Sequence, residues 1–283
     1  MKKGLIKRVV ASALLGIMTM GLVGCGSSNN TSAAGNKNDL LETIQDKGKV
    51  VVGMSADYAP YEFHYIDENG KDVIGGFDVD IANEIASKLG VELVIQEMDF
   101  DALVTALPAG KVDLVISGMN PTEERAKVVD FSEVYYNSQH GILVRAEDVD
   151  KYKTFADLEG AKVGAQLGST QEQIAKNEIP NADLQLLANV NNLILELKSG
   201  KVDAIIMEKP VAQMAVKSNP ELAVGEPTYE EESGGNAVGV AKGNEELLAK
   251  VNEVIKELNE TGKMDEYIVK ANELAATANI VEE

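Results

Sequence analysis

The chain has 283 residues, of which 45% are hydrophobic and 25% charged, and its formal net charge is −20. This balance is typical of a folded globular protein, and the acidic excess argues against nucleic acid as a partner, because phosphate binding needs a basic face. One cysteine and two histidines exclude a disulfide framework and leave no obvious metal-binding cluster, and the chain lacks a Walker A loop, a G-x-S-x-G elbow and an H-E-x-x-H motif, so no metal or cofactor is expected.

Residues 1–24 read as a signal peptide. Four basic residues among the first eight precede an uncharged stretch of 16 residues, Val9–Gly24, which is too short for a comfortable membrane span. The stretch ends in Leu22-Val23-Gly24-Cys25, which resembles the lipobox of bacterial lipoproteins and implies cleavage before Cys25 and its acylation, typically with palmitate. A plain signal peptide with a chance cysteine is the alternative.

Residues 25–38 are small and polar, without apolar periodicity, and are predicted to form a flexible linker. The sequence therefore predicts an acidic body held by its lipid on the extracytoplasmic face of the cell membrane, where the acyl chains supply the membrane affinity. The acidic surface disfavours self-association, so the body is expected to be monomeric.

From Lys49 onward the chain alternates short apolar runs with helical patterns, which predicts an α/β fold with mainly parallel sheets covered by helices. Strands are predicted at 50–54, 91–96, 112–117, 140–145, 162–166, 184–187, 204–207 and 237–241, and helices at 78–89, 103–107, 122–128, 170–177, 191–198, 211–217, 245–259 and 264–274.

An internal echo supports two lobes of similar winding. Leu107-Pro-Ala-Gly-Lys-Val-Asp113 is answered by Leu197-Lys-Ser-Gly-Lys-Val-Asp203, and an apolar run follows each. Chance can produce so short a match, so the echo is support only. Crossings between the lobes are predicted at 140–145 and near 232–236, which divides the body into one lobe of residues 39–136 plus 234–283 and a second of residues 137–233.

Five motifs stand out along the body of the chain: Gly53–Phe63, Gly76–Ile81, Met98–Leu103, Ser117–Arg125 and Val163–Gln171. In this order they resemble the motifs of the bacterial extracellular solute-binding proteins of family 3, which are the amino-acid receptors of ABC importers. The resemblance implies a type II periplasmic-binding-protein-like fold with two hinge crossings. It also implies capture of a free L-amino acid by lobe closure and delivery to a permease that a cytoplasmic ATPase powers.

Arg125 is the candidate partner of the ligand carboxylate, because a planar guanidinium pairs with a carboxylate through two parallel hydrogen bonds. From its position alone, a surface arginine paired with a nearby acid is equally reasonable, and the resemblance favours the binding role. Helix starts predicted at Asn120–Glu123 and Ser169–Glu172 would add N–H groups that favour an anion. The resemblance implies that Thr170, with the neighbouring Ser169, binds the carboxylate and that Ser117, Gly118 and Asn120 bind both head groups.

Glu208 follows the buried run 204–207, at the end of a strand where open α/β sheets bind ligands. The resemblance implies an acid that meets the ligand ammonium, although the family usually has Asp here and Glu is one methylene longer. A solvated acid beside Lys209 is the alternative.

The side-chain pocket is implied by resemblance to be walled by Tyr58, Tyr61 and Phe100, whose faces suit an aliphatic stem or a cation. Ser55 stands where receptors for basic or amide side chains often have Asp, and Glu62 could supply the acid instead or point to solvent. Gln166 is a candidate amide partner of the substrate, with a structural role as its alternative. Asp78 and Asp80 are interpreted as a helix cap and a first-turn acid.

The predicted function is capture of a polar L-amino acid, with a basic one among the options and with arginine, lysine, histidine, glutamine and cystine left open. No catalytic residue is assigned. One alternative is an enzyme on the same scaffold, because some relatives are dehydratases of cyclic carboxylic acids and Glu208 could act as a general acid. Another is a sensory amino-acid receptor that works without a transporter.

Overall fold

The structure is a computed structural model that describes residues 40–137, 139–230 and 233–281. The predicted signal peptide, the linker and Cys25 lie outside these residues. Within the described ranges, no helix combines the length and the apolar character that a membrane crossing requires.

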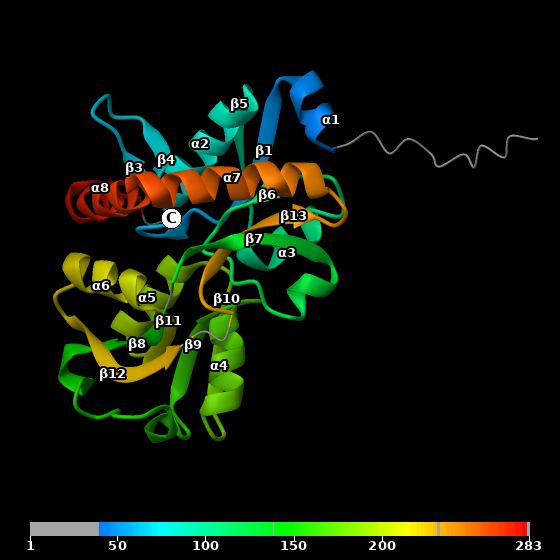
Figure 1. Ribbon diagram of the computed structural model, residues 1–283. Helices are drawn as coiled ribbons and strands as arrows, with labels where there is room; N and C mark the ends of the chain where they lie inside the picture. Colours follow the sequence, from blue (N-terminus) through cyan, green and yellow to red (C-terminus); the bar gives the residue numbers. More distant parts are fainter. Residues whose placement is uncertain (1–39, 138, 231–232, 282–283) are drawn as a thin grey trace, which may run out of the picture. The chain divides into compact units, whose positions relative to one another are not determined.

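The described chain forms two lobes, each built on a five-stranded sheet (Figure 1). The first sheet has the strand order β5-β1-β6-β13-β7, with α2 and α7 packed together beside it and α3 in contact with β1. Its strands are β1 (Lys49–Met54), β5 (Glu92–Glu97), β6 (Leu114–Val115), β7 (Val129–Tyr136) and β13 (Asn236–Ala241), and the helices of this lobe are α1 (Leu40–Lys47), α2 (Phe77–Leu89), α3 (Phe100–Ala106), α7 (Glu245–Thr261) and α8 (Lys263–Thr277).

The second sheet has the strand order β10-β9-β11-β8-β12, with α4 and α5 packed on β9 and β11 and α6 packed on β12 and β8. Its strands are β8 (Gln139–Arg145), β9 (Lys162–Gln166), β10 (Asp183–Leu187), β11 (Ala204–Glu208) and β12 (Leu222–Glu230), and its helices are α4 (Thr170–Glu178), α5 (Val190–Lys198) and α6 (Lys209–Ser218). Short 3-10 turns occur at Ala146–Asp148 and Phe155–Leu158.

A third, small sheet carries several residues of the predicted site. It joins β2 (Asp57–Tyr58), β3 (Glu62–Ile66) and β14 (Asn279–Ile280), and β4 (Asp72–Gly75) pairs with β3. All of these pairs are antiparallel, and β14 places the segment that follows α8 against β3.

Both large sheets are mixed rather than mainly parallel. In the first, β1 is parallel to β5 and β6, whereas β13 is antiparallel to β6 and β7. In the second, β9 is parallel to β10 and β11, whereas β8 is antiparallel to β11 and β12. The strands that run against their neighbours are therefore β13 and β8, and each is the first strand of its sheet after a passage of the chain from the other sheet. The predicted crossing strand 140–145 therefore lies wholly within the second sheet.

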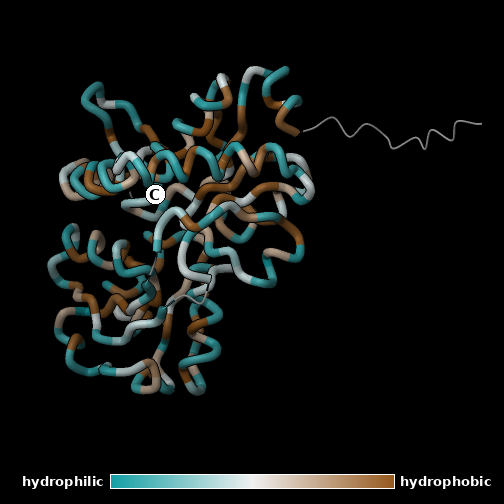
Figure 2. The backbone as a smooth tube through the Cα atoms, in the orientation of Figure 1, coloured by the Kyte–Doolittle hydropathy of each residue, from teal (hydrophilic) through white to brown (hydrophobic). Residues whose placement is uncertain are grey.

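Hydrophobic periodicity explains why these segments fold together. Apolar stretches lie along the strands and on the inner faces of the helices (Figure 2). On α2, Ile81 and Ile85 are fully buried, and Leu247 and Val251 of α7 are buried in the same core. This is the one-sided pattern of an amphipathic helix on a sheet. The second lobe has its own core cluster around Ile142, Val163 and Ile206.

The internal echo of the sequence corresponds to a repeated structural detail. The Asp113 carboxylate accepts from Val51 N–H at 2.8 Å, and Asp113 N–H donates to the Val51 carbonyl at 2.8 Å. In the second lobe, Asp203 makes the same two bonds with Lys162, at 3.0 Å and 2.7 Å. Each aspartate thereby ties the strand that follows it to its parallel neighbour.

Most predicted elements match the structure to within a few residues, and two differ. The predicted helix at 122–128 is only a 3-10 turn at Arg125–Lys127, and the predicted strand at 112–117 shortens to Leu114–Val115. The elements that had no prediction are α1, β7, β12 and the strands of the small sheet, although Tyr61, Phe63 and Tyr65 alternate as a core strand would.

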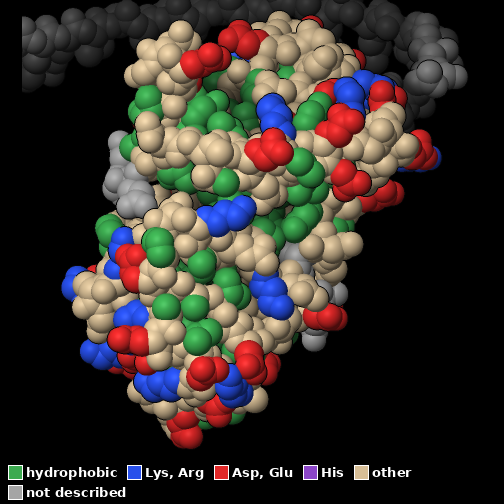
Figure 3. All heavy atoms as spheres, turned by 90° about the vertical axis from the view of Figure 1, so that its left-hand side faces the viewer, with side chains coloured by type: hydrophobic (Ala, Val, Ile, Leu, Met, Phe, Trp, Pro, Cys, Tyr) green, Lys and Arg blue, Asp and Glu red, His purple; other side chains and the backbone are tan. Residues whose placement is uncertain are grey.

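Charged side chains of both signs are interspersed on the face that Figure 3 shows. Surface ion pairs reflect this mixing, for example Lys153 with Glu226 at 2.7 Å and Lys88 with Glu257 at 2.9 Å. Exposed pairs of this kind contribute little to stability, so the fold depends chiefly on its buried cores.

Gly76 is expected to be essential for the start of α2. Its φ is 128°, and a Cβ atom there would lie 2.0 Å from the Tyr61 carbonyl oxygen. Gly76→Ala is therefore expected to lower the free energy of unfolding by about 3 kcal/mol or more, through strain and a backbone clash. Gly90 at the other end of α2 has φ 72° and open space around it, so Gly90→Ala should cost only about 1 kcal/mol. Urea unfolding of both variants measures the difference, and equal losses would contradict the prediction.

Candidate functional site

The predicted site residues lie where strands end. Ser55 follows β1, Ser117 follows β6 closely, and Gln166 and Glu208 are the last residues of β9 and β11. The carboxyl ends of these strands carry the loops that face one another in the described chain, which is where open α/β sheets place ligands.

Arg125 lies at the start of its 3-10 turn and joins segments from both lobes. Its Nη1 donates to the Asn120 carbonyl at 2.8 Å and its Nη2 to the Gly168 carbonyl at 3.0 Å. The guanidinium also lies over the Phe100 ring, 5.4 Å from the centroid, and the residue is 9% exposed. Planar donors held in this way are suited to grip a carboxylate, because a bidentate pair adds geometry to charge.

A cavity of about 560 Å³ lies beside Arg125. Phe100 and Arg125 line it from the first lobe, and Gly168, Ser169 and Thr170 line it from the second. The cavity therefore joins the two lobes next to the guanidinium.

A hydrogen bond between Asn120 and Thr170 is a second connection between the lobes, close to the one that Arg125 makes. Thr170 Oγ1 donates to Asn120 Oδ1 at 2.8 Å, and Asn120 Nδ2 donates to the Gly235 carbonyl at 3.1 Å. Ser169 is the N-cap of α4, where its hydroxyl accepts from Glu172 N–H at 3.2 Å. The start of α4 thus lies against the Asn120 segment, and its first-turn N–H groups favour an anion there.

Glu208 is fully buried and lies among hydrogen-bond donors from the first lobe. Its carboxylate accepts from the Tyr61 hydroxyl and from Asn236 Nδ2, the latter at 3.0 Å. Its backbone N–H donates to the Tyr58 hydroxyl at 3.1 Å, which also accepts from Gln171 Nε2 at 3.0 Å. The two tyrosine rings pack with centroids 5.4 Å apart. The carboxylate is therefore held in place by groups that a ligand ammonium could partly replace.

Two of the other predicted site residues, Gln166 and Ser55, form hydrogen bonds with neighbouring protein groups. Gln166 Nε2 donates to the Ala188 carbonyl at 3.0 Å, so this amide ties β9 to the segment before α5. Ser55 N–H donates to Ser117 Oγ at 3.0 Å, and Ser55 Oγ lies 3.3 Å from Asp57 Oδ1.

Two local expectations were wrong. Asn120 does not begin an α-helix. The hydrogen bond from Ala126 N–H to the Thr122 carbonyl, at 2.9 Å, is not continued into an α-helix, and only the 3-10 turn Arg125–Lys127 follows. Of the two predicted helix starts, only that of α4 faces this region. Asp78 is not the cap of α2, because Gly76 takes that position. Asp78 lies inside the first turn, fully buried, and accepts from Gly118 N–H at 2.8 Å and from the Tyr135 hydroxyl at 3.0 Å.

Four carboxyl groups are buried close to these residues. Asp57, Glu62, Asp78 and Glu208 are each 9% exposed or less. Burial raises the pKa of Asp57 to about 6, and burial raises the pKa of Asp78 to about 7 against the lowering effect of its hydrogen bonds. Burial, together with the Asp78 charge, raises the pKa of Glu62 well above its usual range. Burial therefore disfavours the ionised forms of these carboxyl groups, and a nearby cation would stabilise those ionised forms.

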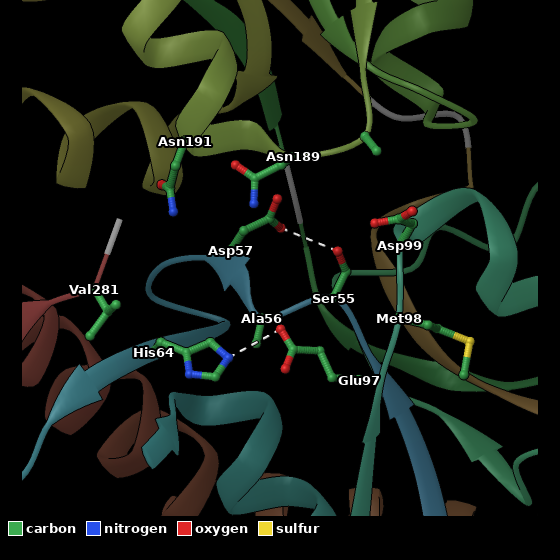
Figure 4. Close-up of a pocket in the computed structure, with 11 residues that line it drawn as sticks. Ser55, Ala56, Asp57, His64, Glu97, Met98, Asp99, Asn189, Asn191 and Val281 are labelled. Atoms are coloured by element: carbon green, nitrogen blue, oxygen red, sulfur yellow. Dashed lines mark hydrogen bonds and ion pairs between the residues drawn. The ribbon is translucent and has the colours of Figure 1, made fainter. Parts of the chain in front are cut away.

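A second cavity of about 310 Å³ lies beside Ser55 and Asp57 (Figure 4). Its lining includes Glu97 and His64, with Asn189 and Asn191 from the second lobe. Burial opposes the charged form of His64, but hydrogen bonds to Asp72 at 2.8 Å and Glu97 at 3.1 Å raise its pKa. On the far side of Asp57, its Oδ2 accepts from Val190 N–H at 2.6 Å, at the start of α5.

Sequence reasoning did not single out Gln171, Tyr135 or Asn236, and it left Asp57 out of the site. The signal for Asp57 was present, since it is an acid that directly precedes the aromatic segment 58–65. Gln171 directly follows the predicted site residue Thr170 and ends the motif Val163–Gln171, so its position was also indicated. Tyr135 and Asn236 contact the site from elements distant in sequence, and local pattern carries no information about such contacts. In the ranges that the structure describes, no group of His, Cys, Asp and Glu has the arrangement of a metal site.

Known proteins are similar to this chain over most of its length. Residues 50–271 match the family model of the bacterial extracellular solute-binding proteins, family 3. The arginine-binding extracellular protein ArtP of Bacillus subtilis (strain 168) is 38% identical over 268 residues, which is 94% of this chain and 96% of that protein. The L-cystine-binding protein TcyJ of Escherichia coli (strain K12) is 32% identical and covers 89% and 91%.

Solved structures show the same similarity in three dimensions. The crystal structure of the amino acid ABC transporter substrate-binding protein AbpA from Streptococcus pneumoniae Canada MDR_19A, bound to L-arginine, superposes with a TM-score of 0.81 at 41% identity. The similarity covers 83% of this chain and 99% of that one.

Proposed function

The chain belongs to the bacterial extracellular solute-binding proteins, family 3, and on that premise we propose that it captures a basic L-amino acid, with arginine as the first candidate. It is an amino-acid-binding component of an ABC importer. The name of the Bacillus relative and the L-arginine in the Streptococcus structure support this choice of substrate. The role proposed here is binding without catalysis.

The observation that carries the proposal is the cluster of buried acids. Asp57, Glu62, Asp78 and Glu208 are buried, and the ionised forms of Asp57, Glu62 and Asp78 are disfavoured by that burial. A basic amino acid brings two cations and one anion, so it offsets part of the cost of burying these carboxylates. A neutral or acidic amino acid has no net positive charge, so it would not offset this cost in the same way.

The proposed assignments follow from the chemistry of the contacts. Arg125 and Thr170 bind the ligand carboxylate at the start of α4, and Glu208 binds the ammonium. Ser117, Gly118, Asn120 and Ser169 complete the polar wall. Tyr58, Tyr61 and Phe100 supply aromatic faces that suit a cationic side chain, with Ser55 and Gln166 at the edge of the site. The other three buried acids provide the negative field that the side-chain cation needs.

We also propose that the lobes comprise residues 39–136 plus 234–283 and residues 137–233, and that they close on the ligand by hinge motion. The hydrogen bonds that join Arg125, Asn120 and Tyr58 to second-lobe residues support this division. A basic amino acid between the lobes would exchange several of these contacts for its own.

Attachment to the membrane through a lipid on Cys25, with the body on the extracytoplasmic face as a monomer, completes the proposal. It rests on the basic start, the uncharged stretch and the position of the sole cysteine. Growth with labelled palmitate and a Cys25→Ser control would test the anchor, because the variant should be released into the soluble fraction without label.

A thermal-shift panel of the twenty amino acids plus cystine tests the substrate. A ligand that binds only the folded state at about 100 times its Kd adds about 2.7 kcal/mol, which raises the melting temperature by roughly 5–10 °C for a protein of this size. Arginine and lysine are expected to give the largest shifts. A larger shift with glutamine, cystine or an acidic amino acid would contradict the proposal.

A further inference from the structure

Two of the buried acids hydrogen-bond to the segment that is proposed to bind the ligand. Glu62 is the first residue of β3, and Asp78 is in the first turn of α2, and both are 0% exposed. Glu62 accepts from Ser117 Oγ at 2.5 Å, and Asp78 Oδ2 accepts from Gly118 N–H at 2.8 Å. The pair therefore contacts Ser117 and Gly118, two of the residues that are proposed to bind the ligand.

The hydrogen bonding of this pair is incomplete unless it carries a proton. Among the described residues, Glu62 Oε2 and Asp78 Oδ1 are buried side-chain oxygens without a donor. The two carboxyl groups nevertheless lie within hydrogen-bond reach of each other. One proton placed between them gives the missing donor and removes a like-charge repulsion, as in other close carboxyl pairs.

The surroundings favour that proton. The ionisable groups that act on the pair are Asp57 and Tyr58 from β2, Tyr135 from β7 and Glu208 from β11, each of which is acidic. In the part of the chain that the structure describes, neither Glu62 nor Asp78 forms an ion pair with a lysine, arginine or histidine. Burial raises the pKa of both groups, that of Asp78 to about 7, so a proton is held on the pair near neutral pH.

We propose that Glu62 and Asp78 share one proton in the unliganded protein and release it to solvent when a basic amino acid binds, which makes the pair a specificity-determining element. This inference rests on the proposed function. The bound cation stabilises the ionised pair, and by linkage the ionised pair stabilises the bound cation. A neutral amino acid with the same head groups lacks the second cation and receives less of this stabilisation.

The sign of the pH dependence follows. The pair in the free protein loses its proton only as pH rises through its raised pKa, whereas the bound cation allows the loss at lower pH. Between these two values binding releases a proton, so the affinity for arginine should increase with pH, by at most about tenfold per pH unit for one proton. Above the pKa of the free pair the affinity should become constant.

Isothermal titration calorimetry with arginine at pH 7, in phosphate and in Tris, tests the inference. This pH lies above the pKa of about 6 of Asp57, so that group contributes little to the proton count. Because Tris takes up a proton with a much larger heat than phosphate does, the difference in binding heat between the buffers gives the number of protons released. We expect a release of up to one proton for the wild type.

Glu62→Gln keeps the shape of the side chain and supplies the missing donor as an amide, so it should bind arginine with the same heat in both buffers. Glu133→Gln is the matched control, because Glu133 lies on β7 with its side chain exposed, and it should release protons as the wild type does. A repeat with Asp78→Asn, together with arginine affinities of the wild type between pH 6 and pH 8, decides the matter if Glu62→Gln does not fold.

Equal heats in both buffers for a wild type that binds arginine would overturn the inference and leave the proposed function intact. Unchanged proton release in folded Glu62→Gln would overturn it as well. A wild type that binds no basic amino acid would instead refute the proposed function.

Discussion

Arg125→Ala is expected to lower the affinity for arginine by roughly 100-fold or more. The change leaves the ligand carboxylate buried without its charged partner, which costs about 3 kcal/mol, and 1.4 kcal/mol corresponds to a factor of ten in affinity. Calorimetry at pH 7 measures the loss. Arg125→Lys should recover only part of it, because an ammonium cannot form two parallel hydrogen bonds to one carboxylate.

Arg145→Ala is the matched control for this prediction. Arg145 is another partly buried arginine, and it hydrogen-bonds to the Val202 carbonyl at 2.7 Å and to Asp203 at 3.3 Å, within the second lobe. Its loss should reduce the melting temperature while the arginine affinity of the folded protein stays within a few-fold of the wild type. Arg125→Ala should lose some stability too, since Arg125 bonds two backbone carbonyls. Wild-type affinity in folded Arg125→Ala would contradict the assignment.

The single substitution Glu208→Gln is expected to weaken arginine binding by about 30- to 100-fold relative to the wild type. The amide removes the charge that faces the ammonium and points one N–H group at Tyr61 or Asn236, both of which now donate to the carboxylate. Glu208→Asp keeps the charge and should bind within about tenfold of the wild type, because the ligand ammonium can approach a shorter acid. Both affinities are measured by calorimetry on variants whose circular dichroism matches the wild type.

Two outcomes would count against this role for Glu208. One is wild-type affinity in Glu208→Gln, which would place the ammonium elsewhere. The other is equal loss in Glu208→Gln and Glu208→Asp, which would mean that the length of the side chain matters and its charge does not.

The α/β class and most helices and strands could be predicted because one-sided apolar periodicity is local information. The run Lys162–Gln166 was predicted with the bounds that the structure gives it, and α2 to within one residue. Strand β7 was missed because Asp130, Ser132 and Glu133 interrupt its apolar pattern. Its pairing with β13, more than 100 residues later, is what makes it a strand.

The same limit applies to the site. That Arg125 and Glu208 lie at candidate binding positions could be inferred from motifs and strand ends. The donors that surround Glu208 could not, because Tyr61 and Asn236 are separated from it by 147 and 28 residues. The helix predicted after Asn120 failed for a related reason, since capping residues favour a helix start but do not supply the packing that maintains one.

The contacts of Asn120 bear on how ligand binding could affect more distant parts of the protein. Its side chain touches Thr170 of the second lobe and the Gly235 carbonyl, just before the chain enters β13, and its own carbonyl accepts from Arg125. A ligand that displaces Thr170 or Arg125 therefore acts, through Asn120, on the backbone at Gly235. The side chain of Asn120 would then both respond to the ligand and transmit the movement. A longer chain of side-chain contacts would not be needed to signal to a transporter that the ligand is bound.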